Sequence, residues 1–306
     1  MSAVPVVSLA PLTNAEVDAD RKVVCGLLPA LEKWGALQVV DHGVPAATVA
    51  GAFEACRRFF ALPLESRMAI RISKDNRGYA PMHNTHYPGN KPDLKESFNV
   101  GLGLTADDPD ILANKPLHGL NRWPELQDFR APVETYFNAI LGLGDRLLGP
   151  LALCLGMTPA DLRALYTKPV AFMRLFHYPP DSNVAEKEYG AAEHKDYGFL
   201  TILAQDANGG LEVRSAEGEL VPVEPRADAF VINIGDMLSE LSGGRIQSPL
   251  HRVVNRSGRA RHSIPFFFDP NFDARFAAMP EITSGEYLLR KFNKFYEYRK
   301  QAAGGG

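Results

Sequence analysis

Cysteine is scarce in this sequence of 306 residues, which contains only three. Cys25, Cys56 and Cys154 lie in apolar stretches with a helical pattern and not at a spacing typical of metal sites. An odd number without a pairing pattern excludes a disulfide framework and indicates free thiols in a reducing compartment. We therefore expect a cytoplasmic protein.

Long uninterrupted apolar runs are also missing. The longest run, around 139–156, contains Asp145 and Arg146, so we do not expect it to cross a bilayer unassisted. The first residues lack the basic start, apolar run and small-residue cleavage site of a secretory signal. These absences predict a soluble chain that has no membrane partner.

The charges show no large excess of either sign. With 33 Lys and Arg against 36 Asp and Glu, the formal net charge is -3. Nucleic-acid-binding proteins usually carry a basic excess on one face, so we expect no nucleic-acid partner. No internal repeat or low-complexity segment is present, and we expect a globular monomer or a weak homo-oligomer.

The sequence does contain residues of the types that bind metal ions. His194 and Asp196 are separated by one residue, and His251 follows much later, in a strand-like segment at 250–255. On an extended strand, residues i and i+2 face the same side, so the first two can hold one ion. Two histidines and one carboxylate are typical of the triad that binds non-haem Fe(II) and leaves coordination positions open. An H-x-D triplet also occurs by chance, so alone it is weak support for a metal site.

A second polar pair follows the distal histidine. Arg261 and Ser263 share one face of an apolar, aromatic segment that reads as a buried strand. A buried arginine needs an anion, because charged side chains are almost never fully buried unpaired. The anion could be the carboxylate of a ligand, held by bidentate hydrogen bonds. It could equally be an Asp or Glu in a structural ion pair.

The second half of the chain consists of short β-type runs separated by turn residues. Such a pattern is typical of a jelly roll, the cupin-like architecture, with a ligand cavity between its sheets. We predict a mostly β core with flanking helices, a double-stranded β-helix. The expected strands are 170–178, 199–205, 210–214, 219–223, 229–234, 246–255 and 262–268.

Helical periodicity dominates the first half of the chain. The expected helices are 14–34, 46–60, 124–156 and 159–165, with strands at 4–9 and 36–41. A capping box at 283–286 predicts a last helix to residue 300, which could pack over the open mouth of the roll. We expect a mixed α/β region at 1–120 that contributes to the substrate pocket. Residues 121–306 would then form the long helix, the jelly roll and the C-terminal helix of the same compact unit.

Taken together, these features resemble the Fe(II)/2-oxoglutarate-dependent dioxygenases, in the branch similar to isopenicillin N synthase. The resemblance covers most of the chain. Besides H-x-D, H and R-x-S, its landmarks are 59–63, 76–79, 95–98, 173–180, 231–236 and 269–273. The family resemblance implies an iron enzyme with 2-oxoglutarate as co-substrate, O2 as oxidant and a small molecule as substrate.

The resemblance also implies roles for individual residues. The H-x-D pair and the distal histidine match the iron ligands of the family. Arg261 and Ser263 match the pair that holds the distal carboxylate of 2-oxoglutarate, and Tyr178 matches a tyrosine that contacts the same molecule. Phe176 departs from the family, because many relatives have an asparagine at this position.

Further residues are candidates for contact with the substrate. On the expected strand 170–178, Arg174 shares a face with Phe176 and Tyr178, so it either reaches the pocket or forms a salt bridge beneath the sheet. The irregular stretch 71–98 borders the substrate pocket in the resembling family. Its cationic and aromatic residues indicate an anionic or amino-acid-like substrate, although a solvated loop explains most of them equally well. The candidates in this stretch are Arg71, Arg77, Tyr79 and His86.

We therefore expect an oxygenase that couples decarboxylation of 2-oxoglutarate to succinate with oxidation of a small organic substrate. The resemblance implies hydroxylation, with desaturation or ring closure requiring only another substrate pose. The first alternative is an iron oxidase of the same fold that uses no 2-oxoglutarate. Two others are a non-catalytic metal-binding protein and a hydrolytic zinc enzyme, although the latter gives no role to the R-x-S pair. The substrate itself does not follow from the fold.

Overall fold

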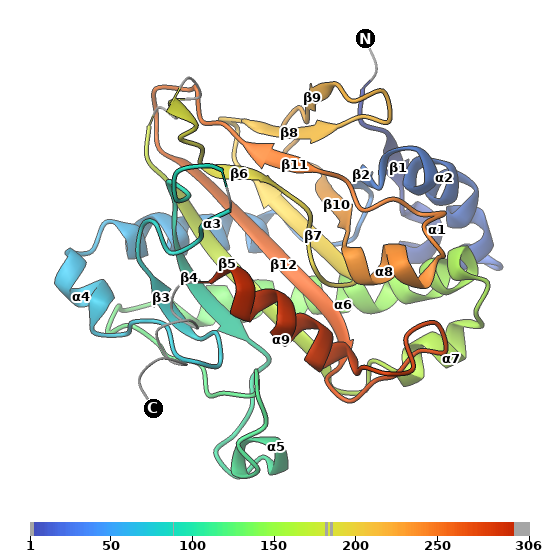
Figure 1. Ribbon diagram of the computed structural model, residues 1–306, viewed down its shortest axis with the longest axis horizontal. Helices are drawn as coiled ribbons and strands as arrows, with labels where there is room; N and C mark the ends of the chain where they lie inside the picture. The colour runs from blue at the N-terminus through green and yellow to red at the C-terminus, as the bar shows by residue number, and fades with distance from the viewer. Residues whose placement is uncertain (1–2, 88, 181–182, 184–185, 297–306) are drawn as a thin grey trace.

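The computed structural model describes residues 3–87, 89–180, 183 and 186–296, and their strands form two sheets (Figure 1). The major sheet has the order β1-β2-β10-β7-β12-β5-β4-β3, and the minor sheet has the order β6-β11-β8-β9. The strands of the major sheet are β1 (Val6–Ser8), β2 (Ala36–Val40), β3 (Gly78–Ala80), β4 (Glu96–Gly101), β5 (Pro169–Tyr178), β7 (Leu200–Gln205), β10 (Phe230–Ile234) and β12 (Arg261–Asn271). Those of the minor sheet are β6 (Ala191–His194), β8 (Leu211–Arg214), β9 (Leu220–Pro222) and β11 (His251–Val253).

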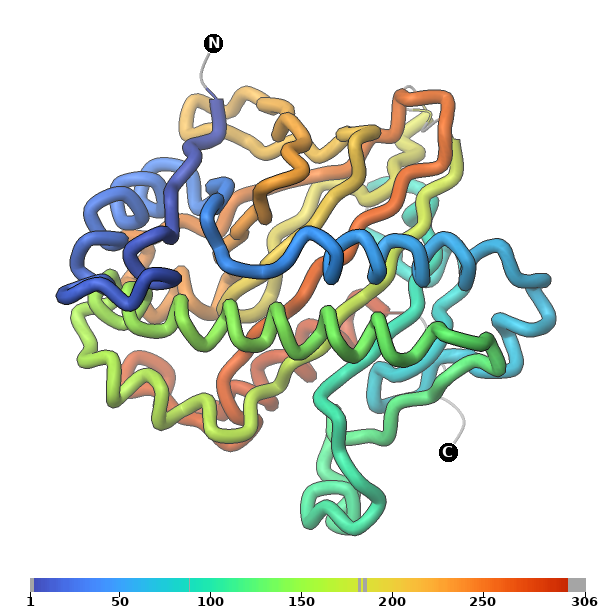
Figure 2. Tube along the Cα trace, turned by 180° about the vertical axis from the view of Figure 1, so that it is seen from behind, coloured from blue at the N-terminus to red at the C-terminus, as the bar shows by residue number. Residues whose placement is uncertain are grey.

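Helices flank the sheets on both sides. Figure 2 shows α3 and α6 lying across the back of the major sheet, and Figure 1 shows α9 in front of it. The described helices are α1 (Ala10–Thr13), α2 (Ala19–Trp34), α3 (Ala46–Phe60), α4 (Leu64–Met68), α5 (Pro109–Leu112), α6 (Arg130–Leu155), α7 (Pro159–Ala164), α8 (Asp236–Leu241) and α9 (Ser284–Phe295). The predicted β core with flanking helices is confirmed.

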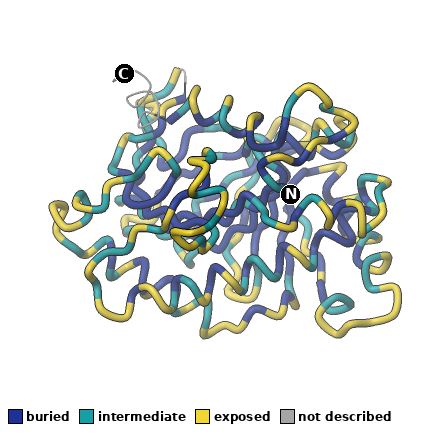
Figure 3. Tube along the Cα trace, turned by 90° about the horizontal axis from the view of Figure 1, so that it is seen from below, coloured by how far each residue is buried: buried dark blue, intermediate teal, exposed yellow. Residues whose placement is uncertain are grey.

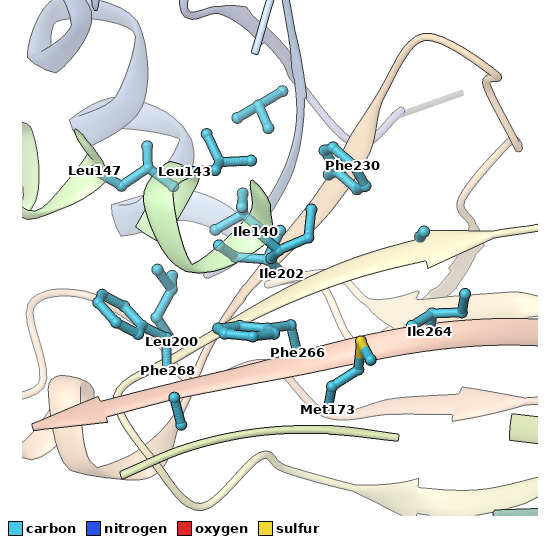
Figure 4. Packing of buried hydrophobic residues seen from close by; sticks show 14 of the residues in the cluster. Ile140, Leu143, Leu147, Met173, Leu200, Ile202, Phe230, Ile264, Phe266 and Phe268 are labelled. Carbon is cyan, nitrogen blue, oxygen red and sulfur yellow. The ribbon is translucent and has the colours of Figure 1, made fainter. Parts of the chain in front are cut away.

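The main hydrophobic core lies between α6 and the back of the major sheet. Ile140 and Leu143 of α6 face Ile202 of β7 and Phe266 of β12 (Figure 4). Because side chains alternate along a strand, the residues of β12 next to Phe266 point to the opposite face of the sheet. Figure 3 shows buried residues concentrated in the interior and exposed ones in the outer loops. The alternation leaves one face of β12 for the core and the other for a ligand cavity.

Helix α6 is long and apolar enough to cross a membrane by length and composition alone. Within its most apolar 18-residue window, however, 56% of the residues are buried inside the protein. The core helix of a folded domain meets the same criterion, because it also presents an apolar surface. The burial of α6 against the sheet accounts for its apolar sequence without a membrane.

The structure corrects several predicted boundaries. The predicted strand 246–255 is reduced to β11, since Pro249 has no N–H for a strand ladder. The stretch 71–98, expected to be irregular, contains β3 and the start of β4, which pair through Tyr79 and Phe98. The long helix begins at Arg130 and not at 124. The last helix has the predicted capping box, and the part of its predicted range beyond residue 296 lies outside the described residues.

Strands from the first 120 residues extend both edges of the major sheet. At one edge β2 pairs with β10, and at the other β4 pairs with β5. The N-terminal region and the jelly roll therefore share one sheet. The boundary at residue 120 stays a prediction.

Candidate metal centre and ligand cavity

The minor sheet brings the two candidate histidines together. His194 is the last residue of β6 and His251 the first of β11, and the two are direct partners in the antiparallel pair. Their Nε2 atoms lie 4.0 and 3.8 Å from Oδ1 of Asp196. One possible ligand atom from each of the three residues lies within 4.8 Å of the others. The predicted triad is thus assembled as a metal-binding cluster.

The hydrogen bonds of the two imidazoles fix which nitrogen can bind a metal. Nδ1 of His194 lies 2.7 Å from the carbonyl of Ala192, and Nδ1 of His251 lies 3.2 Å from the carbonyl of Pro249. A carbonyl oxygen only accepts, so each Nδ1 carries the hydrogen and each Nε2 keeps a lone pair. The pKa of His194 lies well below its usual value, mainly because the side chain is buried and next because His251 is its neighbour. The low pKa favours a neutral His194, and in both histidines the hydrogen bond at Nδ1 leaves Nε2 available as a ligand.

The carboxylate completes the donor set. Asp196 is 8% exposed, and its buried Oδ2 has no hydrogen-bond partner. A buried carboxylate oxygen without a donor is costly unless a cation is bound. Two imidazole nitrogens and a carboxylate suit Fe(II), so the residues present fit the metal that the sequence pattern predicts.

The local structure around Asp196 differs from the prediction in one respect. Strand β6 ends at His194, so the two ligands do not lie on one strand and the i, i+2 argument is wrong in that detail. The turn after β6 is fixed instead by Asp269, whose Oδ1 accepts the N–H of Phe199 at 2.6 Å. A Cβ atom at Gly198 would lie 1.9 Å from the same Oδ1. Only glycine allows the turn to pass so close to Asp269.

Arg261 lies on the cavity face of β12 and is 0% exposed. Its guanidinium donates to the carbonyl of Gly209, to Oγ of Ser263 at 3.1 Å and, at 3.5 Å, to the side chain of Gln205. Its Cζ lies 4.7 Å from the ring centre of Tyr178. In the described part of the chain no Asp or Glu forms an ion pair with this guanidinium, contrary to the structural ion-pair alternative.

The triad and Arg261 line the same cavity. Strands β5, β7, β10 and β12 form its floor, and residues of the minor sheet and of α9 form its other walls. Of the residues predicted from the sequence, it is lined by His194, Asp196, His251, Arg261, Ser263, Tyr178, Arg174 and Phe176.

Arg174 reaches the cavity, which was one of the two outcomes that the sequence left open. It is 6% exposed, and its guanidinium lies over three aromatic rings. The distances from Cζ to the ring centres are 4.7 Å for Tyr296, 5.3 Å for Phe267 and 5.5 Å for Phe172. Arg174 therefore lies in an aromatic cage at the edge of the cavity.

Two of the other predicted substrate residues, Tyr79 and Arg77, stabilise the fold and do not line the cavity. The hydroxyl of Tyr79 donates to the carboxylate of Glu96, and its ring belongs to the core behind the sheet. Arg77 is buried, and its guanidinium donates to the carbonyls of Asp75 and Leu117. Neither lines the cavity, because both side chains are used to hold β3 and the following loop in place.

Arg71 and His86 also lie away from the cavity. Both are exposed, and Nε2 of His86 lies 3.0 Å from the carbonyl of Asn90. The stretch contributes three other residues to the lining, Thr85, Tyr87 and Lys95. The prediction that this region borders the pocket is thus met by residues other than the four named for it.

Sequence reasoning missed an aromatic wall formed by Tyr87, Tyr197, Phe292 and Tyr296. The ring of Tyr87 stacks on that of His194 at 5.1 Å between centres, and the hydroxyl of Tyr197 donates to that of Tyr87 at 3.1 Å. Phe292 and Tyr296 follow Leu288 at intervals of four, so this face of α9 and its end closes one side of the cavity. That spacing was a usable signal.

Two polar residues of the cavity floor were also missed. The pKa of Asp269 is raised to about 7, mainly because the carboxyl is buried. The hydrogen bond from Phe199 lowers this pKa, and the neighbouring Asp196 raises it. Asn233 of β10 is buried and its Oδ1 has no hydrogen-bond partner. Asp269 shares the strand parity of Arg261 and Ser263, which could have identified it.

Two family descriptions match the chain. Residues 4–126 match the N-terminal region described as non-haem dioxygenase in morphine synthesis, and residues 169–270 match the 2OG-Fe(II) oxygenase superfamily. The second match contains the metal triad and the R-x-S pair.

Individual proteins agree with these matches. The 2-oxoglutarate-dependent dioxygenase citB of Monascus ruber is 36% identical over 290 residues, which cover 91% of this chain and 88% of that protein. The structure of a 2OG-Fe(II) oxygenase family protein from Caulobacter crescentus is 28% identical, with a TM-score of 0.81 over 96% of this chain and 99% of the other. JOX2, solved in complex with 2OG, Fe and JA, is 26% identical, with a TM-score of 0.78 over 94% of this chain and 85% of the other.

Proposed function

The chain belongs to the 2OG-Fe(II) oxygenase superfamily, as a non-haem Fe(II)- and 2-oxoglutarate-dependent dioxygenase, and from this premise we propose the reaction and the roles of its residues. We propose that it hydroxylates a small organic molecule while 2-oxoglutarate is converted to succinate and CO2. Desaturation or ring closure would use the same site with a different substrate pose.

His194, Asp196 and His251 would hold the iron through Nε2, a carboxylate oxygen and Nε2. Arg261 and Ser263 would bind the distal carboxylate of 2-oxoglutarate, with Tyr178 packed beside them. When bound, the iron supplies the activation of O2 that no side chain can provide. The protein supplies the orientation of both organic molecules around it.

The observation that carries this proposal is the environment of Arg261. Its fully buried guanidinium faces the cavity of the metal triad, and its hydrogen bonds go to neutral groups. An anionic partner would strongly stabilise a buried cation. A ligand carboxylate can receive two parallel hydrogen bonds from such a guanidinium.

The aromatic wall supports the same function. Burial raises the pKa values of Tyr87 and Tyr197 above their usual range, so both phenols stay protonated and neutral. Neutral aromatic side chains beside the metal ligands exclude bulk water from the cavity. Exclusion of water would direct the oxidising power to the bound substrate.

A turnover measurement tests the proposal. The protein is supplied with Fe(II), 2-oxoglutarate and a panel of small organic molecules, and O2 uptake, succinate and CO2 are quantified. We expect succinate to form in step with O2 uptake and to increase with an oxidised panel member. O2 uptake without succinate would indicate the 2-oxoglutarate-independent oxidase, and zinc-dependent hydrolysis without O2 uptake would indicate a hydrolytic site.

The cytoplasmic location, the monomeric or weakly associated state and the absence of nucleic-acid and membrane partners stay predictions. They depend on composition and charge and not on the site.

A further inference from the structure

We propose that the molecule oxidised by this enzyme carries a carboxylate and that Arg174 binds it, at the end of the cavity away from Arg261. This inference rests on the proposed function, because it assigns the second organic molecule of the same reaction. It gives the cavity two anion-binding ends, one for the co-substrate and one for the substrate.

The first argument is the placement of the two arginines on the sheet. Arg261 is the direct strand partner of Tyr178, and Arg174 precedes Tyr178 by four residues on the same face of β5. Four residues of strand span about 13 Å. This is far enough apart for two separate ligands, and both arginines line one cavity with the metal triad.

The second argument is a polar side pocket. A small hollow adjoins the main cavity and shares with it Thr85, Lys95, Arg174, Phe176 and Tyr296. Its remaining lining includes the polar residues Asn84, Ser97 and Asn99. Arg174 therefore lies where the aromatic cavity meets a hydrogen-bonding recess, which suits the polar end of an otherwise apolar molecule.

The third argument is the presence of a second cationic side chain at this end. Lys95 lines both the main cavity and the recess together with Arg174, and it forms an ion pair with the buried Asp93. Arg174 and Lys95 therefore place two cationic side chains at the end of the cavity where we propose that the substrate carboxylate binds.

The fourth argument is the shape of the guanidinium and its support. An arginine offers a carboxylate two parallel donors, which a lysine cannot do. The rings of Phe172, Phe267 and Tyr296 surround the guanidinium of Arg174 and restrict its rotamers, so less rotamer freedom is lost when an anion binds. The cage thus prepares a fixed, flat anion-binding group.

The test compares carboxylates with their primary amides. Wild-type protein with Fe(II) and saturating 2-oxoglutarate, kept under argon so that no turnover occurs, is titrated with benzoate, phenylacetate, hexanoate and octanoate and with the four matching amides. Saturation with 2-oxoglutarate keeps Arg261 occupied. We expect at least one carboxylate to bind about tenfold or more tightly than its amide, as for a hydrogen-bonded charged group.

Variants assign the preference to Arg174. Arg174→Met should reduce the ratio of amide to carboxylate dissociation constants to about one, and Arg174→Lys should retain part of it. Arg226→Met is the matched control, since it removes a cation that pairs with Asp228 on the surface, and it should leave the ratio unchanged. Melting temperatures confirm that each variant is folded, and a merely structural role of Arg174 would lower the affinities for both members of a pair equally.

Two failures can be told apart. If the wild-type protein does not bind 2-oxoglutarate in the presence of Fe(II), the proposed function fails. If it binds 2-oxoglutarate but no carboxylate binds more tightly than its amide, or if Arg174→Met keeps the preference, only the role of Arg174 is overturned.

Discussion

The two ends of the cavity hold their arginines in different ways. Arg261 is fully buried and fixed by hydrogen bonds to Gly209, in the connection between β7 and β8, and to Ser263 on its own strand β12. Arg174 lies in an aromatic cage that combines β5, β12 and Tyr296, which follows α9. The first end is built from the strands of the jelly roll itself, and the second depends on an added C-terminal segment.

The same cavity contains the metal cluster. Its two histidines are strand partners in the minor sheet, so their separation is set by backbone pairing, whereas Asp196 follows the end of β6. In the proposed function, the cavity has a co-substrate end at Arg261 and a substrate end at Arg174 that sequence changes in α9 would reshape.

The largest effect is expected from removing the centre that both ends share. Asp196→Ala should abolish turnover and lower Fe(II) affinity by at least about 100-fold, because it removes a metal ligand. Calorimetric titration with Fe(II) under argon measures this directly. Asp228→Ala, which removes a surface carboxylate, is the control, and full activity of Asp196→Ala would exclude this residue from the ligand set.

The second prediction concerns only the end of the cavity at Arg261. Arg261→Met should weaken 2-oxoglutarate binding by about 2–5 kcal/mol, the usual loss for one partner of a buried hydrogen-bonded charge pair. Fe(II) affinity should stay unchanged, because Arg261 is not a member of the metal triad. An unaltered dissociation constant for 2-oxoglutarate would mean that Arg261 binds something else.

The third prediction concerns pH and the buried Asp269. Its pKa is about 7 in the folded protein and near 3.8 in a solvated carboxyl. The folded state therefore keeps the proton longer, and raising the pH from about 4 to 7 should lower stability as the unfolded state ionises first. Asp269→Asn keeps an acceptor for the N–H of Phe199 but cannot ionise.

Melting temperatures of the metal-free proteins at pH 5 and pH 8 give the test. The melting temperature of Asp269→Asn minus that of the wild type should be a few degrees larger at pH 8 than at pH 5. A difference that is the same at both values would show that Asp269 titrates normally.

The smallest effect should come from the position that departs from the family. Phe176 is the strand partner of Ser263, so Phe176→Asn would place an amide beside the co-substrate end. One added hydrogen bond should tighten 2-oxoglutarate binding by no more than about tenfold. Weaker binding would indicate that the Phe176 ring, which packs under Lys95, supports the cavity through its shape.

The metal triad, the R-x-S pair and Tyr178 could be assigned to one site from the sequence because an ordered motif resembles that of a known family, and strand parity also linked Arg261 with Ser263. Parity placed Arg174 on the same face of its strand as Tyr178 and left open whether it reaches the pocket. Helical spacing was a usable signal for α9, whereas the residues of the 71–98 stretch could not be placed in this way. Tyr79 and Arg77 are polar residues in the expected region, yet Glu96 and backbone carbonyls bind them, and such long-range partners leave no local pattern.

The central claim is that one metal ion, held by the triad, and Arg261 together bind 2-oxoglutarate. It is tested by titrating 2-oxoglutarate into the protein under argon, with and without Fe(II), for the wild type and Asp196→Ala. We predict one bound 2-oxoglutarate per wild-type chain when Fe(II) is present, and much weaker binding without the metal or without Asp196. Equal affinity in all four titrations, or no binding in any of them, would contradict the account.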